Sequence, residues 1–388
     1  MESIDRMIYL DNNATTPLDP GVAEKMAWVL KEHFGNPSSI YPIGRDAKQM
    51  VTEAREIVAE ALGASRSEIF FTGSGTESDN WAIRGVMRRR RDRPEFITSA
   101  VEHPAVSETA AYLERQGHTV HYIPVDRKGT LDLDFLKKTV SPRTALISVM
   151  FANNELGTIQ PIEDVVAIAR PHDILVHTDA VQAFGKLPFS VDKLGVDLLS
   201  VSAHKIYGPK GIGALYIRRG VEIDPLIYGG HQEQQLRPGT ENTAGIVGFG
   251  EAVRIMRESF DKDKKRIEKL ADRLKNGIEE RIPKAVLNGP EKNRVKSTLN
   301  FSFYGLEAEA LLLALATKDI YVSTGSACSE ESEDVSHVLN AIGLQPEVAR
   351  STLRISLGRF TTEQDIDRVL EELPEIVRRL REISAIEI

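Results

Sequence analysis

The sequence predicts an α/β protein, with a large domain built on a mostly parallel sheet covered by helices and a smaller C-terminal α/β domain. Short apolar, β-rich runs alternate with helix-length stretches from about residue 68 to residue 217. Near-continuous apolar strands separated by helices are typical of a sheet that is buried on both faces. After a long charged helix the order of strands and helices changes, which indicates a second unit.

Composition and charge narrow the class of protein. The chain has 388 residues, of which 41% are hydrophobic and 27% are charged, and this excludes a disordered, collagen-like or coiled-coil chain. At roughly 150 residues per domain, the length predicts two to three domains. The net charge of −8 gives no general reason to bind nucleic-acid phosphates or anionic membranes.

The N-terminus and the cysteine count predict the compartment. The N-terminus is charged and no apolar segment follows it, so we expect no signal peptide. The longest apolar run, near Leu311–Ala316, is far shorter than the ~20 residues of a membrane span. The single cysteine, Cys328, excludes an intrachain disulfide, and the nine histidines show no paired metal spacing. We therefore expect a cytoplasmic protein without a metal site.

The elements of the large domain follow from runs of apolar and β-branched residues between polar turns. The expected strands are Ile69–Thr72, Phe96–Ser99, Val120–Pro124, Ala145–Phe151, Ile174–Thr178, Leu198–Ser202 and Gly213–Ile217. The expected helices include Ser78–Arg90, Ser107–Arg115 and Ile162–Arg170. Ligands bind beyond the carboxyl ends of such strands, so polar residues just after each strand are the first candidates for chemistry.

The second unit begins beyond a charge-rich helix at about Glu251–Glu280. Strands and helices are mixed in this part of the chain, which predicts a smaller α/β domain. The expected strands are Thr298–Ser302, Ile320–Val322 and Leu353–Ser356, and the expected helices are Glu307–Ala316 and Thr362–Ser384.

The first candidate for chemistry is the segment Gly73-Ser-Gly-Thr-Glu-Ser78, which follows an expected strand and opens a helix. Glycines allow close backbone approach, helix N-terminal N–H groups favour an anion, and Thr76 offers a hydroxyl to a phosphate. Taken alone, a plain strand–turn–helix connection with Ser78 as N-cap is the simpler interpretation. The P-loop pattern and the third glycine of a dinucleotide fingerprint are absent, so the motif points to one phosphate at most.

Two further strand ends carry Asp179 and Lys205. A carboxylate at a buried strand end is costly unless donors or a cation pair with it, so Asp179 is either an N-cap or the counter-ion of a protonated ring nitrogen. Lys205 can form a Schiff base where its pKa is lowered, although a solvated loop is the commoner fate of a lysine. Together, the phosphate turn, the aspartate and the lysine are the parts that pyridoxal phosphate needs.

The chain also resembles a known family over essentially its whole length. The matching segments are Tyr9–Pro17, His33–Ser39, Thr72–Ser78, Glu102–His103, Asn153–Glu155, Asp179–Gln182, Ser202–Lys205, Arg237–Asn242, Gly325–Cys328 and Leu353–Arg359. On these motifs it is identified as a member of the cysteine desulfurases of NifS/IscS type, in the class V aminotransferase superfamily. The resemblance implies the fold type I of pyridoxal-phosphate enzymes, with a large domain at 15–255 and a small domain formed by 1–14 and 256–388.

The resemblance also implies roles at the cofactor ring. Lys205 matches the Schiff-base lysine, Asp179 the partner of the pyridine nitrogen and Gln182 the donor to the phenolic oxygen. His103 resembles the histidine that stacks on the ring and helps with proton transfer. A simpler role for His103 is to cap the helix that begins at Pro104.

Further roles concern the phosphate and the substrate. Asn154 and Arg354 match positions near the cofactor and the substrate carboxylate, although a surface-facing charge is the plain alternative for Arg354. Thr240 matches the residue that reaches the phosphate of the neighbouring subunit, which implies a homodimer. The residues that match the phosphate cradle are Gly75, Thr76, Ser202 and His204.

Cys328 distinguishes among the branches of the family. It stands in a run of small and acidic residues, Ser323–Asp334, whose composition predicts an exposed, mobile loop. The neighbouring acids should raise the pKa of the thiol, so thiolate formation is expected to depend on docking near His103 or on substrate.

The expected activity is removal of sulfur from L-cysteine, which gives L-alanine and a persulfide on Cys328. The persulfide would pass to an iron–sulfur scaffold protein or another sulfur acceptor. One alternative is a transaminase or selenocysteine lyase on the same fold, and a transaminase would not need Cys328. Another is a non-catalytic sulfur carrier or assembly subunit, against which Lys205, Asp179 and Cys328 argue together. The sequence names neither the acceptor nor the pathway.

Overall fold

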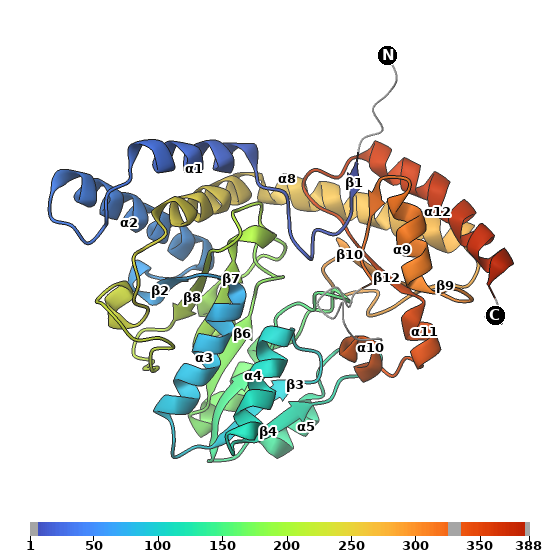
Figure 1. The fold of residues 1–388 in the computed structure, drawn as a ribbon. Coiled ribbons are helices and arrows are strands. Elements are labelled where there is room, and N and C mark those ends of the chain that lie inside the picture. The colour runs from blue at the N-terminus through green and yellow to red at the C-terminus, as the bar shows by residue number, and fades with distance from the viewer. Residues whose placement is uncertain (1–6, 325–334, 385–388) are drawn as a thin grey trace.

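The computed structural model describes residues 7–324 and 335–384, and within them a seven-stranded sheet forms the centre of the larger part (Figure 1). The strand order is β2-β8-β7-β6-β5-β3-β4, and the five strands from β7 to β4 are parallel. β8 runs antiparallel to both of its neighbours, so the prediction of a mostly parallel sheet is confirmed. The strands are β2 Ile69–Thr72, β3 Glu95–Ser99, β4 Thr119–Ile123, β5 Thr144–Ser148, β6 Leu175–Asp179, β7 Leu198–Ser202 and β8 Gly213–Ile217.

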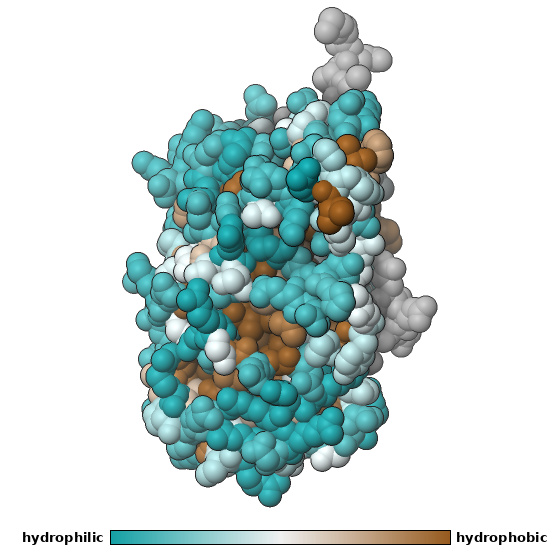
Figure 2. Space-filling model, turned by 90° about the vertical axis from the view of Figure 1, so that its left-hand side faces the viewer, coloured by the Kyte–Doolittle hydropathy of each residue, from teal (hydrophilic) through white to brown (hydrophobic). Residues whose placement is uncertain are grey.

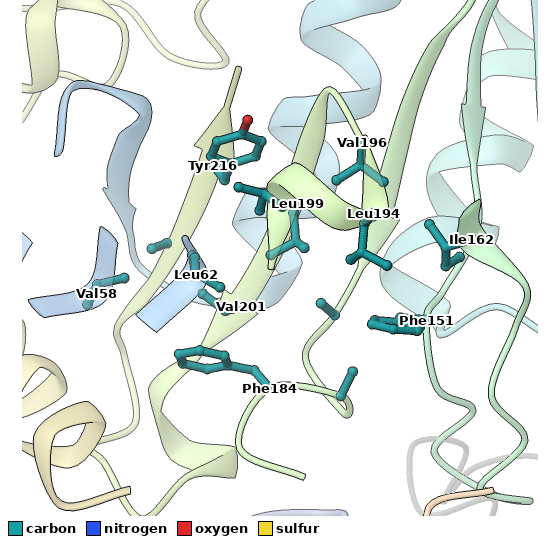
Figure 3. Close-up of a cluster of buried hydrophobic side chains, with 14 of the residues drawn as sticks. Val58, Leu62, Phe151, Ile162, Phe184, Leu194, Val196, Leu199, Val201 and Tyr216 are labelled. Atoms are coloured by element: carbon teal, nitrogen blue, oxygen red, sulfur yellow. The ribbon is translucent and has the colours of Figure 1, made fainter. Parts of the chain in front are cut away.

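Helices cover both faces of this sheet, which explains why β2, β5, β6, β7 and β8 are buried along their whole length, whereas the edge strand β4 is partly exposed. One face packs on α2, α6 and α7, whose Leu62, Ile162 and Leu194 belong to the same buried cluster as Leu199 and Val201 of β7 (Figure 3). The other face packs on α3 and α4 around a separate apolar cluster. The helices are α1 Pro20–Glu32, α2 Pro42–Leu62, α3 Gly75–Arg89, α4 Pro104–Arg115, α5 Leu133–Thr139, α6 Ile162–Ala169 and α7 Val191–Leu194.

A second hydrophobic core belongs to the C-terminal part of the chain and to the N-terminal strand. β1 pairs with β11 in parallel, and β12-β10-β9 form an antiparallel sheet. Ile8 and Leu10 are buried in this core, so the two ends of the chain share it. The division into domains at the predicted boundaries stays a prediction. The elements are β1 Ile8–Tyr9, β9 Ala285–Leu287, β10 Thr298–Phe303, α9 Ala308–Ala316, β11 Ile320–Tyr321, α10 His337–Ala341, α11 Pro346–Arg350, β12 Thr352–Ser356 and α12 Glu363–Ile383.

Helix α8, Thr243–Arg281, is 39 residues long and connects the two cores (Figure 1). It begins earlier than the helix that the charge pattern predicts. The sequence does not indicate the first turns because they are rich in glycine, which has a low helix propensity. Packing against α1 and α2 overrides that propensity. A Cβ at Gly248 would lie 2.7 Å from Met26 Cγ, and a Cβ at Gly250 would lie 2.9 Å from the Cα of Ala54, so these contacts require glycine.

Helix α3 also begins earlier than predicted. Its N-cap is Ser74, whose side chain accepts the backbone N–H of Glu77 at 3.1 Å, and not Ser78, which lies buried in the second turn. No helix among the described residues is long and apolar enough to cross a membrane. Four single-turn 3-10 helices complete the elements, namely η1 Arg66–Glu68, η2 Arg170–His172, η3 Ala203–Lys205 and η4 Glu233–Gln235.

Candidate active site

The carboxyl ends of β6 and β7 lie side by side because these strands are parallel neighbours. Asp179 ends β6, Ser202 ends β7, and Lys205 lies in the 3-10 turn that follows. Asp179 is paired with Ser200, which lies two residues before the end of β7, so the two strands end close to the same level of the sheet. Residues that the sequence places after different strands therefore meet at one edge of the sheet, where α/β proteins bind ligands.

Lys205 is half-buried, and the N-terminal segment holds its ammonium group. Its Nζ donates to the carbonyl oxygens of Asn13 and Ala14, both at 2.6 Å. Thr16 fixes the same segment, since its backbone N–H and its hydroxyl both donate to the carbonyl of His204. The alternative of a lysine in an open loop is therefore wrong.

Asp179 is buried, with 5% of its surface exposed, and its Oδ1 accepts the N–H of Val181 at 2.8 Å. Burial raises the pKa of Asp179 to about 6, against the lowering effects of the Val181 N–H and the Lys205 charge. A carboxylate in this setting gains from a further cation nearby, and a protonated ring nitrogen is such a cation. Gln182, also buried, donates from Nε2 to the carbonyl of Asn13 at 2.9 Å.

His103 is the N-cap of α4, and its Nδ1 accepts the N–H of Ala105 at 3.1 Å. The pKa of His103 is lowered to about 4, chiefly by burial and also by the charges of Lys205 and His337. The ring is therefore neutral near pH 7, and because Nδ1 is an acceptor, Nε2 carries the proton. The capping role is confirmed, and it orients the imidazole without excluding a role at the cofactor.

The protonation of His103 leads to a test. In the cofactor-free protein we expect the His103 ring resonances to stay constant from pH 8 down to about 5.5, because the lowered pKa lies near 4. The unfolded chain takes up this proton near pH 6.5 and the folded chain only near 4, so this residue's contribution to stability falls as the pH drops through that window. Histidine NMR, with His103→Asn to assign the signals, measures the titration. A midpoint near 6.5 would contradict the neutral-ring interpretation.

The start of α3 and the end of β7 form a group of donors suited to a phosphate. Ser202 Oγ is buried and has no hydrogen-bond partner among the described residues. A Cβ at Gly75 would lie 2.8 Å from Val181 Cγ2 and 3.5 Å from the Ser202 Cβ, so glycine keeps the helix N-terminus close to this hydroxyl. Thr76 opens the same helix, where backbone N–H groups have no intrahelical acceptor. These residues fit the phosphate of pyridoxal phosphate.

His204 lies beside this group of donors. Its Nδ1 is 3.1 Å from the Thr15 hydroxyl, which gives the ring a fixed orientation. The pKa of His204 is lowered to about 4, chiefly by burial and also by the charges of Lys205 and Lys210. The neutral ring can donate one N–H bond to an anion.

Arg354 is buried in β12, with 3% of its surface exposed, so the alternative of a surface-facing charge is wrong. Its guanidinium forms an ion pair with Asp11 Oδ1 at 2.8 Å and contacts the carbonyl of Asn154 at 3.4 Å. Arg354 Nε is buried and has no hydrogen-bond partner among the described residues. Asn154 is half-buried, and its carbonyl also accepts from the side chain of Asn13.

One predicted residue, Thr240, is not brought into this group, and another cannot be placed. Thr240 is exposed, beyond η4 and before α8. Cys328 lies outside the described residues. The described chain on either side of it reaches the site, since Ser323 pairs with Arg354 through two backbone hydrogen bonds and Ser336 donates to buried Glu155 at 2.6 Å.

Sequence reasoning missed three residues that hold the site together. The backbone carbonyl of Asn13 accepts hydrogen bonds from Lys205 and Gln182. Lys186 donates to Gln182, and Asp11 forms an ion pair with Arg354. The only available signals were the polar run Asp11–Asn13 and the spacing of Lys186 four residues after Gln182.

Comparisons with known proteins show which family the chain matches. The model of the family described as Aminotransferase class-V matches residues 8–369. The chain is 50% identical to the cysteine desulfurase IscS of Methanosarcina thermophila over 381 residues, 98% of this chain and 94% of that protein. It is also 50% identical to the protein of the same name from Dictyoglomus turgidum, covering 98% and 96%.

Solved structures show the same fold. A NifS-like protein matches with a TM-score of 0.91 and 43% identity, covering 97% of this chain and 100% of that one. A NifS-like protein from Rickettsia africae matches with a TM-score of 0.87 and 32% identity, covering 96% and 100%. The structure titled SspA in complex with cysteine matches with a TM-score of 0.81 and 39% identity, covering 92% and 100%.

Proposed function

Because the chain belongs to the class V aminotransferase family, and within it is a pyridoxal-phosphate-dependent cysteine desulfurase, we propose that Lys205, Asp179 and Cys328 divide the removal of sulfur from L-cysteine between them. The observation that carries the assignment is the meeting of Lys205, buried Asp179 and neutral His103 beside the Ser202 hydroxyl, which has no partner within residues 7–324 and 335–384.

The described residues suit each part of the cofactor. Ser202, His204 and the start of α3 would hold the phosphate, Asp179 the ring nitrogen and Lys205 the aldehyde. Gln182 would donate to the phenolic oxygen, since its Nε2 is already a donor. When bound, pyridoxal phosphate supplies an electron sink that makes the substrate Cα proton acidic and weakens the bond from Cβ to sulfur.

The protein residues bind the substrate and move its protons. Arg354 presents a planar fork to the carboxylate of L-cysteine, and the ion pair with Asp11 holds that fork in place. Lys205 takes the proton from Cα and is positioned for this by the N-terminal segment. His103 is neutral and its Nδ1 accepts the N–H of Ala105, so its Nε2–H can donate a hydrogen bond at the site without adding charge.

Cys328 would receive the sulfur. Its thiolate forms an S–S bond with the substrate Sγ while the Cβ–Sγ bond breaks, and the electron pair stays on the carbon side. A proton delivered to Cβ, together with the return of the proton that Lys205 took from Cα, completes L-alanine, and Cys328 keeps the sulfur as a persulfide. The anchoring of Ser323 beside Arg354 and of Ser336 at Glu155 supports this role, because both ends of the segment lie at the site.

The function is tested by adding L-cysteine and dithiothreitol to the holoenzyme and quantifying alanine and sulfide together. Equal amounts of the two products support the proposal. A transaminase would instead form an oxo-acid product and consume an acceptor, and a protein that binds no cofactor would form neither product.

A homodimer is part of the proposal. Figure 2, which views the side where α2 lies in Figure 1, shows hydrophobic residues gathered in a hollow of the surface. Large apolar side chains are exposed around the α1–α2 connection and before η4, and an apolar surface of this kind favours burial against a second copy. They include Phe34 at 78%, Ile40 at 89% and Tyr228 at 79% exposed.

Mixing of variant subunits tests whether the sites are shared. Lys205→Ala and Thr240→Ala subunits should form heterodimers in which one site carries both changes and the other carries neither. We expect about a quarter of the parent activity to return in an equal mixture at limiting cofactor. Each homodimer alone is the control, and native mass spectrometry counts the heterodimers. Heterodimers without recovered activity would show that Thr240 serves its own subunit.

The proposal also includes the protein that accepts the sulfur. The name IscS of two relatives that are 50% identical to this chain supports delivery to an iron–sulfur scaffold protein, and another thiol protein would accept the sulfur by the same exchange. A cytoplasmic location fits this role and stays a prediction.

A further inference from the structure

Lys186 lies seven residues beyond the end of β6, at the back of the proposed site. Its Nζ donates to Asn13 Oδ1 at 2.7 Å and to Gln182 Oε1 at 2.6 Å. Burial lowers the pKa of Lys186 to about 7, and the charges of Lys205 and Arg354 add to this. Placing an ammonium among other cations is costly, and the mechanism described above makes no use of this one.

The contacts of Lys186 impose a direction on two amides. A side-chain amide can turn over and exchange its oxygen for its NH2 group, but Lys186 Nζ donates to both side chains here, with three N–H donors as an ammonium and two as a neutral amine. The oxygens of Asn13 and Gln182 must therefore face Lys186, and both NH2 groups must face away. Asn13 Nδ2 accordingly donates to the carbonyl of Asn154 and to the hydroxyl of Thr298, at 2.9 and 2.8 Å.

The same argument applies to Gln182 with a direct consequence for the cofactor. Its Nε2 points away from Lys186 and donates to the carbonyl of Asn13, which also receives Lys205. Gln182 thus presents a donor, and not an acceptor, on the side where Lys205 lies. A phenolic oxygen that carries negative charge is stabilised by a donor and repelled by an amide oxygen.

We propose that Lys186 is a positioning residue that locks the amide of Gln182 with its N–H groups toward the cofactor ring. This inference rests on the role of Gln182 in the proposed function. Lys186 touches neither substrate nor cofactor in this assignment and acts on the cofactor ring through Gln182. Its stem lines a cavity of about 300 Å³ between the two cores, which leaves space for a longer side chain at this position.

A double-mutant cycle separates this role from simple packing. Lys186→Met keeps the stem and removes the donors, and Gln182→Ala removes the amide. We expect Lys186→Met to weaken pyridoxal phosphate binding about tenfold and to shift the visible absorption band of the bound cofactor. In the Gln182→Ala background the same change should have no further effect on either. Exposed Lys193→Met is the matched control for loss of a lysine.

The outcomes are distinct. Equal effects of Lys186→Met in both backgrounds, or an unchanged band with only a lower melting temperature of the cofactor-free protein, would overturn the proposal. Where Lys186→Met does not fold, Lys186→Arg and Lys186→Gln replace it. Arginine has only donors and should preserve the band, whereas glutamine also offers an oxygen and should not, and the reverse order counts against the lock.

The cycle does not depend on turnover. If the parent protein binds pyridoxal phosphate but forms no alanine from cysteine, the proposed function fails while the affinities and spectra still report on Lys186. If Gln182→Ala leaves the cofactor band unchanged, the donor role of Gln182 is wrong and the inference fails with it.

Discussion

Lys205→Ala is expected to reduce the formation of alanine and sulfide from L-cysteine by at least about 10³-fold. Lys205 is proposed both to bind the cofactor and to carry the Cα proton, so one substitution removes two steps. Its Nζ is held by the carbonyls of Asn13 and Ala14. Among the described residues, no other lysine lies in the turn directly after a strand at this edge of the sheet. The measurement is the initial rate of alanine production at saturating cofactor.

The covalent assignment has its own measurement. Borohydride reduction of the holoenzyme followed by peptide mapping should place the pyridoxyl group on Lys205. Lys210, which is exposed five residues further on, is the matched control, and Lys210→Ala should retain the adduct and the activity. An adduct on Lys210, or on the half-buried Lys186, would show that the site has been assigned to the wrong lysine.

Cys328→Ala is expected to stop sulfur transfer while leaving the earlier proton chemistry intact. Removal of the Cα proton needs Lys205, Asp179 and the bound cofactor but no thiol. The variant should therefore exchange the Cα proton of L-cysteine with deuterated water and form almost no alanine or persulfide, a loss of about 10³-fold or more. NMR of the recovered cysteine and an alanine assay measure the two steps separately.

A neighbouring substitution gives the control for Cys328. Ser329→Ala changes the same segment without removing the thiol, and it should keep most of the alanine production. If Cys328→Ala turned over L-cysteine at the parent rate, the thiol would be a bystander. A lyase or transaminase reaction on the same fold would then explain the activity better than persulfide transfer.

The strands of the sheet could be predicted because their signal is local. A buried parallel strand needs apolar residues on both faces, so β2, β7 and β8 were predicted with their observed bounds. α2 was not predicted, although Ala47, Val51, Ala54, Val58 and Leu62 recur at helical spacing, and all are buried. The first turns of α8 were missed for a different reason, since their glycines disfavour a helix until α1 and α2 pack against it.

The site was predictable where a strand end carries the chemistry. Asp179, Ser202 and Lys205 follow apolar strands that proved to be neighbours, so their order along the chain implied their proximity. The state of His103 was not predictable in this way. A histidine before Pro104 suggests a cap, but its lowered pKa results from burial and from charges on distant segments.

The sequence by itself determined the fold class, the strand ends that carry chemistry and the cofactor that this set of residue types needs. Only the tertiary structure decided which partners complete them. Arg354 pairs with Asp11, 343 residues away, and Lys186 turns the amides of Asn13 and Gln182. The physical reason is the distance along the chain over which each signal acts. The formation of a strand depends on the side chains of that strand, whereas the partners of a buried charge belong to whichever segments packing brings within about 3 Å of it.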